Sequence, residues 1–491
     1  MKLESFELGT KIGKEEYAEA LPELRVALLN AQFDLRKAGF SVVLLLAGDD
    51  YQGVDELVDV LHEWLDARYI DTEVFLRPTD VERERPLFFR YWQALPPRGR
   101  VGIHVGGWAV GAVRAEVLDE GTPESRAQTL RHVSGFERGL VEDGTLLLKV
   151  WVHLSPKEHA RRRKSGKRPA GAEDEEGSRW VWEQPAEALR AAEDFIEKTD
   201  TASAPWWIVE GTNDRHRNLT VARALLEALE GRLGSASEPE SSAGLAVRLP
   251  PAPDVLGNVD LRAELSRKEY RSQLDDLQDR VRKLAIEARE RRVATVLAFE
   301  GWDAAGKGGC IRRITRPLEA RDYRVVPIAA PSELEQAHHY LWRFWRELPA
   351  RGRIVVFDRS WYGRVLVERV EGLARDDEWL RAYEEIRDFE EQLTESGAAL
   401  AKFWLHIDPD EQLRRFRARE QTPYKKYKIT DEDYRNRDRW DDYAAAVNDM
   451  VARTSSDSAP WHVVAANDKR HARLRVLEET CNALESALAR A

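Results

Sequence analysis

Cysteine is scarce in this sequence, and long apolar runs are missing. Its two cysteines, Cys310 and Cys481, are too few for a disulfide framework or a cysteine-based metal site. No apolar run approaches the length that crosses a membrane, and residues 1–7 lack the charged and apolar regions of a signal peptide. We therefore expect a cytoplasmic protein that does not enter a membrane.

An excess of basic charge is missing as well. The 76 lysines and arginines are outnumbered by 87 aspartates and glutamates, so the formal net charge is −11 at pH 7. This balance argues against a general nucleic-acid-binding protein, and we expect no nucleic-acid partner. The 491 residues, of which 43% are hydrophobic, are enough for two buried cores.

A glycine-rich loop is the strongest chemical signal in the chain. Residues 299–309 read Phe-Glu-Gly-Trp-Asp-Ala-Ala-Gly-Lys-Gly-Gly; the apolar stretch at 293–299 predicts a buried parallel strand, and residues 311–314 predict the start of a helix. In this context the N–H groups of the loop and the helix N-terminus bind phosphate oxygens. Lys307 adds a positive charge where negative charge develops during phosphoryl transfer. The predicted substrate-binding positions of the loop are Gly301, Ala304, Ala305, Gly306, Gly308 and Gly309.

The loop departs from the usual phosphate-binding pattern at one position. That pattern ends in Gly-Lys-Ser/Thr, whose hydroxyl holds Mg²⁺, but here Gly308 follows the lysine. Another oxygen ligand is needed, and Asp303 lies within the loop. Mg²⁺ takes one or two carboxylates together with phosphate oxygens, and Asp358 ends a second predicted strand at 354–358. We predict a magnesium site at Asp303 and Asp358.

The chain contains an internal repeat. A shift of 253 residues (301 − 48 = 253) pairs Gly48 with Gly301 and Asp50 with Asp303, and it also aligns residues 92–100 with 345–353. A register held over this distance indicates one domain fold used twice. The predicted domains are residues 1–230 and 254–491, joined by a linker at 231–253 that is rich in glycine, serine, alanine and proline.

The two halves serve as controls for each other, because residues present in only one of them are candidates for chemistry. Lys307, Asp358, Arg359 and Arg364 correspond to Val54, Val105, Gly106 and Gly111. The first half is therefore predicted to have lost its phosphate chemistry. Residues that both halves share, such as Trp361 with Trp108 and His406 with His153, are predicted to be packing residues.

A basic segment follows a third predicted strand of the second half, at 401–407. Between residues 414 and 428 the sequence holds Arg414, Arg415, Arg417, Arg419, Lys425, Lys426 and Lys428, with Glu420 as the opposing charge. Such a run is often a solvated helix face. In phosphoryl-transfer folds this is the place of a mobile basic lid, which closes over the phosphates and excludes water.

These features together resemble the polyphosphate kinase 2 family. The resemblance rests on four segments, at 301–309, 358–364, 423–428 and 459–469, and the tandem arrangement is similar to the two-domain members of that family. It implies an α/β fold: two tandem P-loop kinase-like three-layer α/β/α domains with parallel sheets, and a helical lid on the C-terminal copy. The implied activity transfers the terminal phosphate of inorganic polyphosphate to AMP, giving ADP.

The resemblance also implies roles for individual residues. The loop lysine of the family falls on Lys307, and its two Mg²⁺-binding aspartates fall on Asp303 and Asp358. Further contacts with the phosphate chain are implied for Arg359, Arg364, Arg417, Lys425, Lys426 and Lys428.

Two other functions stay open at the level of the sequence. The Asp358-Arg359-Ser360 segment also resembles the Asp-Arg motif of ATP-dependent nucleoside or nucleotide kinases. A non-catalytic polyphosphate-binding regulatory module is the second alternative, although the retained Lys307 and Asp303 argue against it. The acceptor preference among AMP, GMP and ADP is not readable, and the oligomeric state, with a homodimer among the options, is open too.

Overall fold

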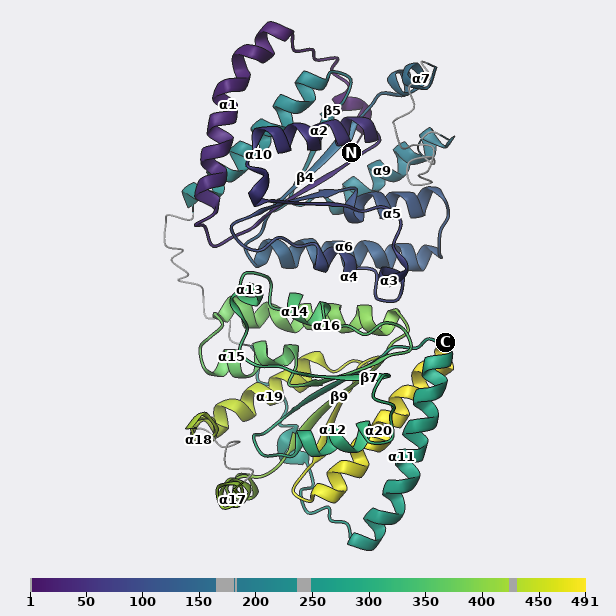
Figure 1. Cartoon of the computed structure of the whole chain (residues 1–491), viewed down its shortest axis with the longest axis vertical. Helices are drawn as coiled ribbons and strands as arrows, with labels where there is room; N and C mark the ends of the chain where they lie inside the picture. Colours follow the sequence, from purple (N-terminus) through teal and green to yellow (C-terminus); the bar gives the residue numbers. More distant parts are fainter. Residues whose placement is uncertain (1, 165–180, 182, 236–248, 424–430) are drawn as a thin grey trace. The chain divides into compact units, whose positions relative to one another are not determined.

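The chain forms two compact units. The computed structural model describes residues 2–164, 181, 183–235, 249–423 and 431–491 (Figure 1). The first unit comprises Met1–Thr79, Arg90–Leu245 and Glu333–His339, and the second comprises Asp80–Phe89, Ala246–Ser332 and Tyr340–Ala491. Each unit thus contains one short segment that comes from the other half of the sequence.

The first unit is built around a five-stranded parallel sheet with the order β2-β3-β1-β4-β5. Helices α1, α2 and α10 pack together, as do α5, α6 and α9, and these groups flank the sheet (Figure 1). Its elements are η1 (Leu3–Phe6), α1 (Lys14–Leu35), β1 (Val42–Gly48), α2 (Tyr51–Trp64), η2 (Ala67–Tyr69), β2 (Ile70–Val74), α4 (Phe89–Gln93), β3 (Val101–Val105), α5 (Gly107–Val117), α6 (Pro123–Glu142), β4 (Leu146–His153), α7 (Pro156–Lys164), α9 (Pro185–Thr199), β5 (Trp206–Glu210), α10 (Asp214–Ser235) and α13 (Glu333–Gln336).

The second unit repeats this plan, with the strand order β10-β9-β6-β8-β7. Here α11, α12 and α20 pack together, and so do η4, α15, α16 and α19. Its elements are α3 (Asp80–Arg83), η3 (Leu256–Asn258), α11 (Arg267–Glu290), β6 (Thr295–Gly301), α12 (Lys307–Thr315), β7 (Tyr323–Pro327), α14 (Trp342–Trp345), β8 (Ile354–Asp358), η4 (Trp361–Val365), α15 (Val367–Val370), α16 (Asp376–Glu395), β9 (Ala399–His406), α17 (Pro409–Glu420), α18 (Asp431–Asp438), α19 (Trp440–Thr454), β10 (Trp461–Ala465) and α20 (Lys469–Arg490). The predicted tandem α/β fold with parallel sheets is confirmed.

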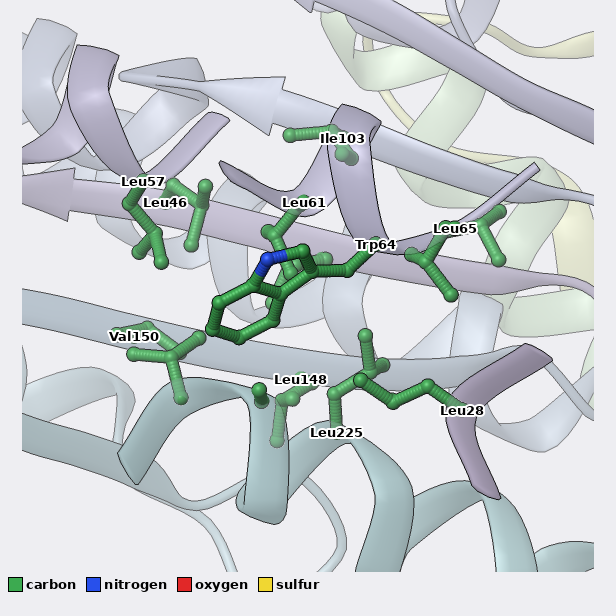
Figure 2. Close-up of a cluster of buried hydrophobic side chains, with 14 of the residues drawn as sticks. Leu28, Leu46, Leu57, Leu61, Trp64, Leu65, Ile103, Leu148, Val150 and Leu225 are labelled. Atoms are coloured by element: carbon green, nitrogen blue, oxygen red, sulfur yellow. The ribbon is translucent and has the colours of Figure 1, made fainter. Parts of the chain in front are cut away.

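One hydrophobic core cluster of the first unit lies between its sheet and the group α1, α2 and α10. Every residue of β1 is buried, as expected for a central parallel strand covered on both faces. Figure 2 shows the Trp64 indole at the end of α2 among Leu61, Leu148 and Leu225. Burying one such leucine stabilises the fold by about 1.5–3 kcal/mol relative to leaving it in water.

The predicted packing role of the shared tryptophans is confirmed. Trp108 donates a hydrogen bond to Glu137 (2.7 Å), and Trp361 donates to Glu390 (3.0 Å) at the equivalent position. Each glutamate also accepts from a buried lysine of the central sheet, at 2.8 Å in the first unit and 2.7 Å in the second. Both units therefore keep the same buried polar network, in which each charge has a partner.

Candidate functional site

A cavity of about 690 Å³ lies at the carboxyl end of the sheet of the second unit. Open parallel sheets bind ligands at this edge. The residues that line it include the glycine-rich loop, charged side chains and one amide: Asp303, Ala304, Ala305, Gly306, Lys307, Gly308, Gly309, Arg312, Asp358, Arg359, Arg414, Arg415, Arg419, Asp433, Asn436, Lys469 and Arg473.

The glycine-rich loop turns sharply between β6 and α12. Gly301 has φ +147°, and a Cβ atom there would stand 2.7 Å from the Leu405 carbonyl oxygen, so no larger residue fits. Gly306, with φ +116°, caps the N-terminus of α12. The Lys307 ammonium, in the first turn of that helix, donates to the Gly301 carbonyl at 2.6 Å. The loop thus brings a helix N-terminus and a lysine to the cavity, an arrangement that binds anions.

The predicted acids meet Lys307 at this cavity. Asp303 accepts a hydrogen bond from Asn436 through Oδ2 (3.1 Å), and its Oδ1 lies 3.5 Å from Nη2 of Arg359. Asp358 is half-buried at the end of β8 and lines the same cavity. The chain turns directly after it, with Arg359 at φ +67°. The structure therefore brings together Asp303, Lys307, Asp358 and Arg359, which lie far apart in the sequence.

These carboxylates fit Mg²⁺. Within the described residues no group of three or more histidine, cysteine, aspartate or glutamate side chains could hold a metal ion. An ion held by two aspartates alone needs further oxygen ligands, and Mg²⁺ takes them from substrate phosphates and water. Asp303 and Asp358, which line a cavity next to a phosphate-binding loop, are suited to this mode of binding.

In the first unit the corresponding aspartate has different partners. Asp50, the counterpart of Asp303, is 2% exposed; it caps α2 by accepting from the Gly53 N–H and pairs with Arg162 at 2.7 Å. Burial raises the pKa of Asp50. Asp303 is 17% exposed and faces the cavity. The shared aspartate is therefore buried in a cap and an ion pair in the first unit, whereas in the second it lines the cavity.

Glu300 is a residue beside the site that the sequence analysis did not single out. It is buried at the end of β6 and accepts hydrogen bonds from both the N–H (2.7 Å) and the hydroxyl (2.8 Å) of Ser360. Burial raises the pKa of Glu300, while the nearby Lys307 charge opposes that rise. The contact fixes the turn at Arg359 relative to the phosphate loop. A glutamate within an otherwise apolar strand was the available signal.

The basic segment contributes one face of α17 to the cavity. Arg414, Arg415, Ala418 and Arg419 of α17 line it, together with Thr422 just after the helix. Neighbours three and four positions apart share one side of a helix. The predicted Arg417 lies on the exposed side of this helix and does not line the cavity. The predicted lid residues Lys425, Lys426 and Lys428 lie outside the described residues.

Arg364 does not line the cavity either. Its Nε lies 3.2 Å from Glu368, its Nη1 lies 3.9 Å from Glu378, and its guanidinium stacks on the Tyr340 ring. Arg364 lies close to Asp358 in the sequence, but it belongs to η4 and is not among the residues that line the cavity. Its guanidinium takes part in local packing.

Two further cations, Lys469 and Arg473, reach the cavity from α20. Strand pairing shows which residues of the first unit correspond to them. Trp206 pairs with Lys149 in the first unit, and Trp461 pairs with Lys402 in the second. From the last strand onward the shift between the units is therefore 255 residues (461 − 206 = 255) rather than 253. Lys469 thus corresponds to Asp214 and Arg473 to Asn218. The first half has lost these charges too, and the ungapped comparison of the halves missed this.

The Lys469 ammonium has an unusual environment. The residue as a whole is exposed, but partial desolvation of the ammonium and then the positive charge of Arg415 lower its pKa to about 8. Two like charges that both line the cavity disfavour each other's charged form. A bound polyanion would relieve this repulsion.

An aromatic stack joins the phosphate loop to the start of α19. The rings of Trp302 and Trp440 lie parallel, with centroids 3.6 Å apart and an interplanar angle of 10°. Trp302 also donates to Nδ1 of His406 at 3.0 Å. Burial lowers the pKa of His406 to about 4, so it accepts this bond as a neutral ring. Its predicted packing role is confirmed.

The described part of the chain contains no helix that is both long and apolar enough to cross a membrane.

Comparison with known proteins gives consistent results. Residues 11–236 and 264–491 each match the family described as Polyphosphate kinase 2 (PPK2). The chain is 46% identical over 495 residues to a polyphosphate:AMP phosphotransferase of Pseudomonas aeruginosa, covering 99% of both chains. It is 38% identical to one of Acinetobacter johnsonii, with 97% of each chain covered. A crystal structure from Pseudomonas aeruginosa described as a polyphosphate kinase 2 matches all of both chains, with a TM-score of 0.89 and 45% identity. This chain belongs to the polyphosphate kinase 2 family.

Proposed function

We propose that this protein transfers the terminal phosphoryl group of inorganic polyphosphate to AMP and forms ADP. The charge of the cavity carries the proposal: eight lysines and arginines line it against three aspartates, in a chain whose net charge is −11. So strong a local reversal suits a polyanionic substrate. The names of the relatives that match over nearly the full length support the same donor and acceptor.

The chain contributes to this reaction by positioning and by charge. The phosphate loop and Lys307 hold phosphate oxygens, and Arg359 lies beside Asp303, where it balances charge on the transferred group. Asp303 and Asp358 would hold Mg²⁺, which when bound neutralises phosphate oxygens and aligns donor with acceptor. Lys469 and Arg473 supply cations for further phosphates of the donor.

The donor is tested directly with the full chain, Mg²⁺ and AMP. We expect ADP to form with polyphosphate and much more slowly with ATP. ADP formation from ATP but not from polyphosphate would favour an ATP-dependent nucleotide kinase. Polyphosphate binding without any ADP formation would favour a regulatory module.

Catalysis is proposed to reside in the second unit alone. The first unit has Val54, Asp214 and Asn218 where the second has Lys307, Lys469 and Arg473, and its loop aspartate is buried against Arg162. The three replacements each remove a cation that would bind phosphate, and the buried aspartate is no longer placed to hold a metal ion. The first unit is left with the shared scaffold.

A further inference from the structure

Arg415 lines the cavity, but its hydrogen-bond donors are not available to a substrate. Its side chain is 3% exposed. Nη1 donates to the carbonyls of Ala304 (3.0 Å) and Ala305 (2.6 Å), Nη2 donates to those of Ala466 (2.6 Å) and Asn467 (2.9 Å), and Nε donates to Glu411. A guanidinium has five N–H donors, and all five are used within the protein.

These bonds connect three segments that line the site. Ala304 and Ala305 belong to the phosphate loop after β6, and Ala466 and Asn467 belong to the loop after β10, which leads into α20. Arg415 itself lies on α17. The sequence separations are large, at 111 residues from Ala304 and 51 from Ala466. A single planar group therefore sets the distance between the phosphate loop and the first turn of α20, which begins with Lys469.

The first unit shows the same arginine in a different arrangement. Arg162 is the counterpart of Arg415 at the shift of 253 (415 − 253 = 162), and it contacts the Gly211 carbonyl at 3.4 Å, as Arg415 contacts Ala466. On the other side, however, Arg162 pairs with the carboxylate of Asp50. The contact with the last-strand loop is thus common to both units. In the second unit, whose phosphate loop carries Lys307, the arginine donates instead to two carbonyls of that loop.

We propose that Arg415 is a positioning residue for phosphoryl transfer: by tying the Ala304–Ala305 carbonyls to those of Ala466–Asn467, it holds the phosphate loop and the cations of α20 in register on one phosphate chain. This inference rests on the proposed function. The loop amides and Lys307 bind one part of the donor, and Lys469 and Arg473 bind another, so their spacing has to match that of successive phosphates.

Lysine cannot replace this arginine. Its ammonium has three donors at one point, whereas the acceptors of Arg415 lie on opposite sides of a planar fork. Misplacing a reacting group by about 1 Å can cost on the order of 10²-fold in rate. We therefore expect both Arg415→Lys and Arg415→Met to lower kcat by about 10²-fold, with a smaller change in KM for AMP.

Arg162→Met is the matched control. It removes the equivalent guanidinium, which is 22% exposed, from the unit that is proposed to lack the chemistry. It should lower the melting temperature while kcat stays within about twofold of wild type. Circular dichroism and melting curves show which variants are folded at the assay temperature. The proposal is overturned if Arg415→Met keeps the kcat of Arg162→Met, or if Arg415→Lys restores wild-type kcat. Where the methionine variant does not fold, the lysine variant decides.

A binding measurement separates this proposal from the proposed reaction. Calorimetric titration with tripolyphosphate should show affinity about tenfold weaker for Arg415→Met and unchanged for Arg162→Met. If wild type makes no ADP but Arg415→Met still binds tripolyphosphate more weakly than Arg162→Met, the proposed reaction is wrong and the positioning role stands. If ADP forms but both variants bind tripolyphosphate like wild type, the positioning role is wrong.

The pH dependence of binding gives a further readout. The charges around the Lys469 ammonium are Arg414, Arg415 and Glu411 on α17 and Arg473 on α20. Removing the Arg415 charge should raise the pKa of Lys469, so the loss of tripolyphosphate affinity at alkaline pH moves to higher pH. Arg162→Met should leave it in place. If Arg415→Met loses tripolyphosphate affinity at the same alkaline pH as wild type, the expected interaction between the charges of Arg415 and Lys469 is contradicted.

Discussion

Lys307 and Asp303 show how the surroundings of a residue decide its contacts. The Lys307 ammonium is held on the Gly301 carbonyl of its own loop, at the N-terminus of α12. Asp303 has the same residue type and loop position as Asp50, but Asn436 and Arg359 hold it toward the cavity. The sequence shows both aspartates as equals, and only their partners distinguish them.

The first prediction concerns Lys307. Lys307→Ala should lower kcat for ADP formation from polyphosphate by about 10²-fold or more, because it removes one electrostatic partner of the transition state. Lys198→Ala, which breaks a surface ion pair with Asp194 in the first unit, should leave kcat unchanged. Near-normal turnover in the Lys307 variant would refute the role of the loop.

The second prediction concerns pH. The pKa of Lys469 is lowered to about 8, so its positive charge is present at pH 7 and largely absent at pH 9. Affinity for tripolyphosphate should therefore fall between these pH values in wild type. Lys469→Arg keeps its charge and should bind with much less pH dependence, as measured by titration calorimetry at pH 7 and pH 9. An equal fall in both proteins would remove Lys469 from the polyanion site.

At the scale of the elements, short caps decide where the charged side chains lie. Asp468 accepts hydrogen bonds from the N–H groups of Arg470 and His471 and so starts α20 at Lys469. Ser266 starts α11 in the same manner, as half of a capping box with Glu269. The two helices pack against each other and differ in whether their first turn meets the cavity.

The third prediction compares these two caps. Asp468→Ala and Ser266→Ala should each lower the free energy of unfolding by about 1 kcal/mol, the usual loss of a helix cap. Only Asp468→Ala should also raise KM for polyphosphate, because the first turn of α20 then no longer holds Lys469 in place. Denaturant melts and initial rates measure both effects. Equal KM values in the two variants would show that this cap has no role at the site.

Much of the element order was predictable, and the misses have physical causes. The strand, loop and helix at 293–314 follow from apolar patterning and glycines. β6 and α12 confirm their order, although the helix already begins at Lys307, ahead of the expected start at 311. The cations of α20 were missed because the register between the halves changes by two residues before β10, and strand pairing reveals this. Arg417 was assigned by its neighbours in sequence, whereas the helical period determines which side chains face the cavity.

At the scale of the whole molecule, sequence halves and compact units do not coincide. Asp80–Phe89 belongs to the second unit. There the Glu84 carbonyl accepts from the Arg351 N–H (3.0 Å), the Glu84 carboxylate pairs with Arg292, and Arg85 donates to the Leu348 carbonyl (3.2 Å). The second unit is therefore incomplete without a segment from the first half of the chain.

The fourth prediction follows from this composition. A fragment of residues 254–491 contains the whole described cavity but lacks Asp80–Phe89, so it should melt at lower temperature than the second unit of the full chain and form ADP more slowly. Calorimetric melting and ADP assays of both proteins measure this. A fragment with the melting temperature and kcat of the full chain would show that the segment is dispensable.

The sequence by itself determined the duplicated α/β fold and the glycine-rich loop, and it predicted Asp303 and Asp358, which line one cavity, because these depend on local patterning and on comparison of two copies within one chain. Tertiary structure alone decided which further cations join them. Lys469, Arg473 and Arg415 reach the loop because parallel strands end at one edge of the sheet, and no spacing along the chain encodes that proximity.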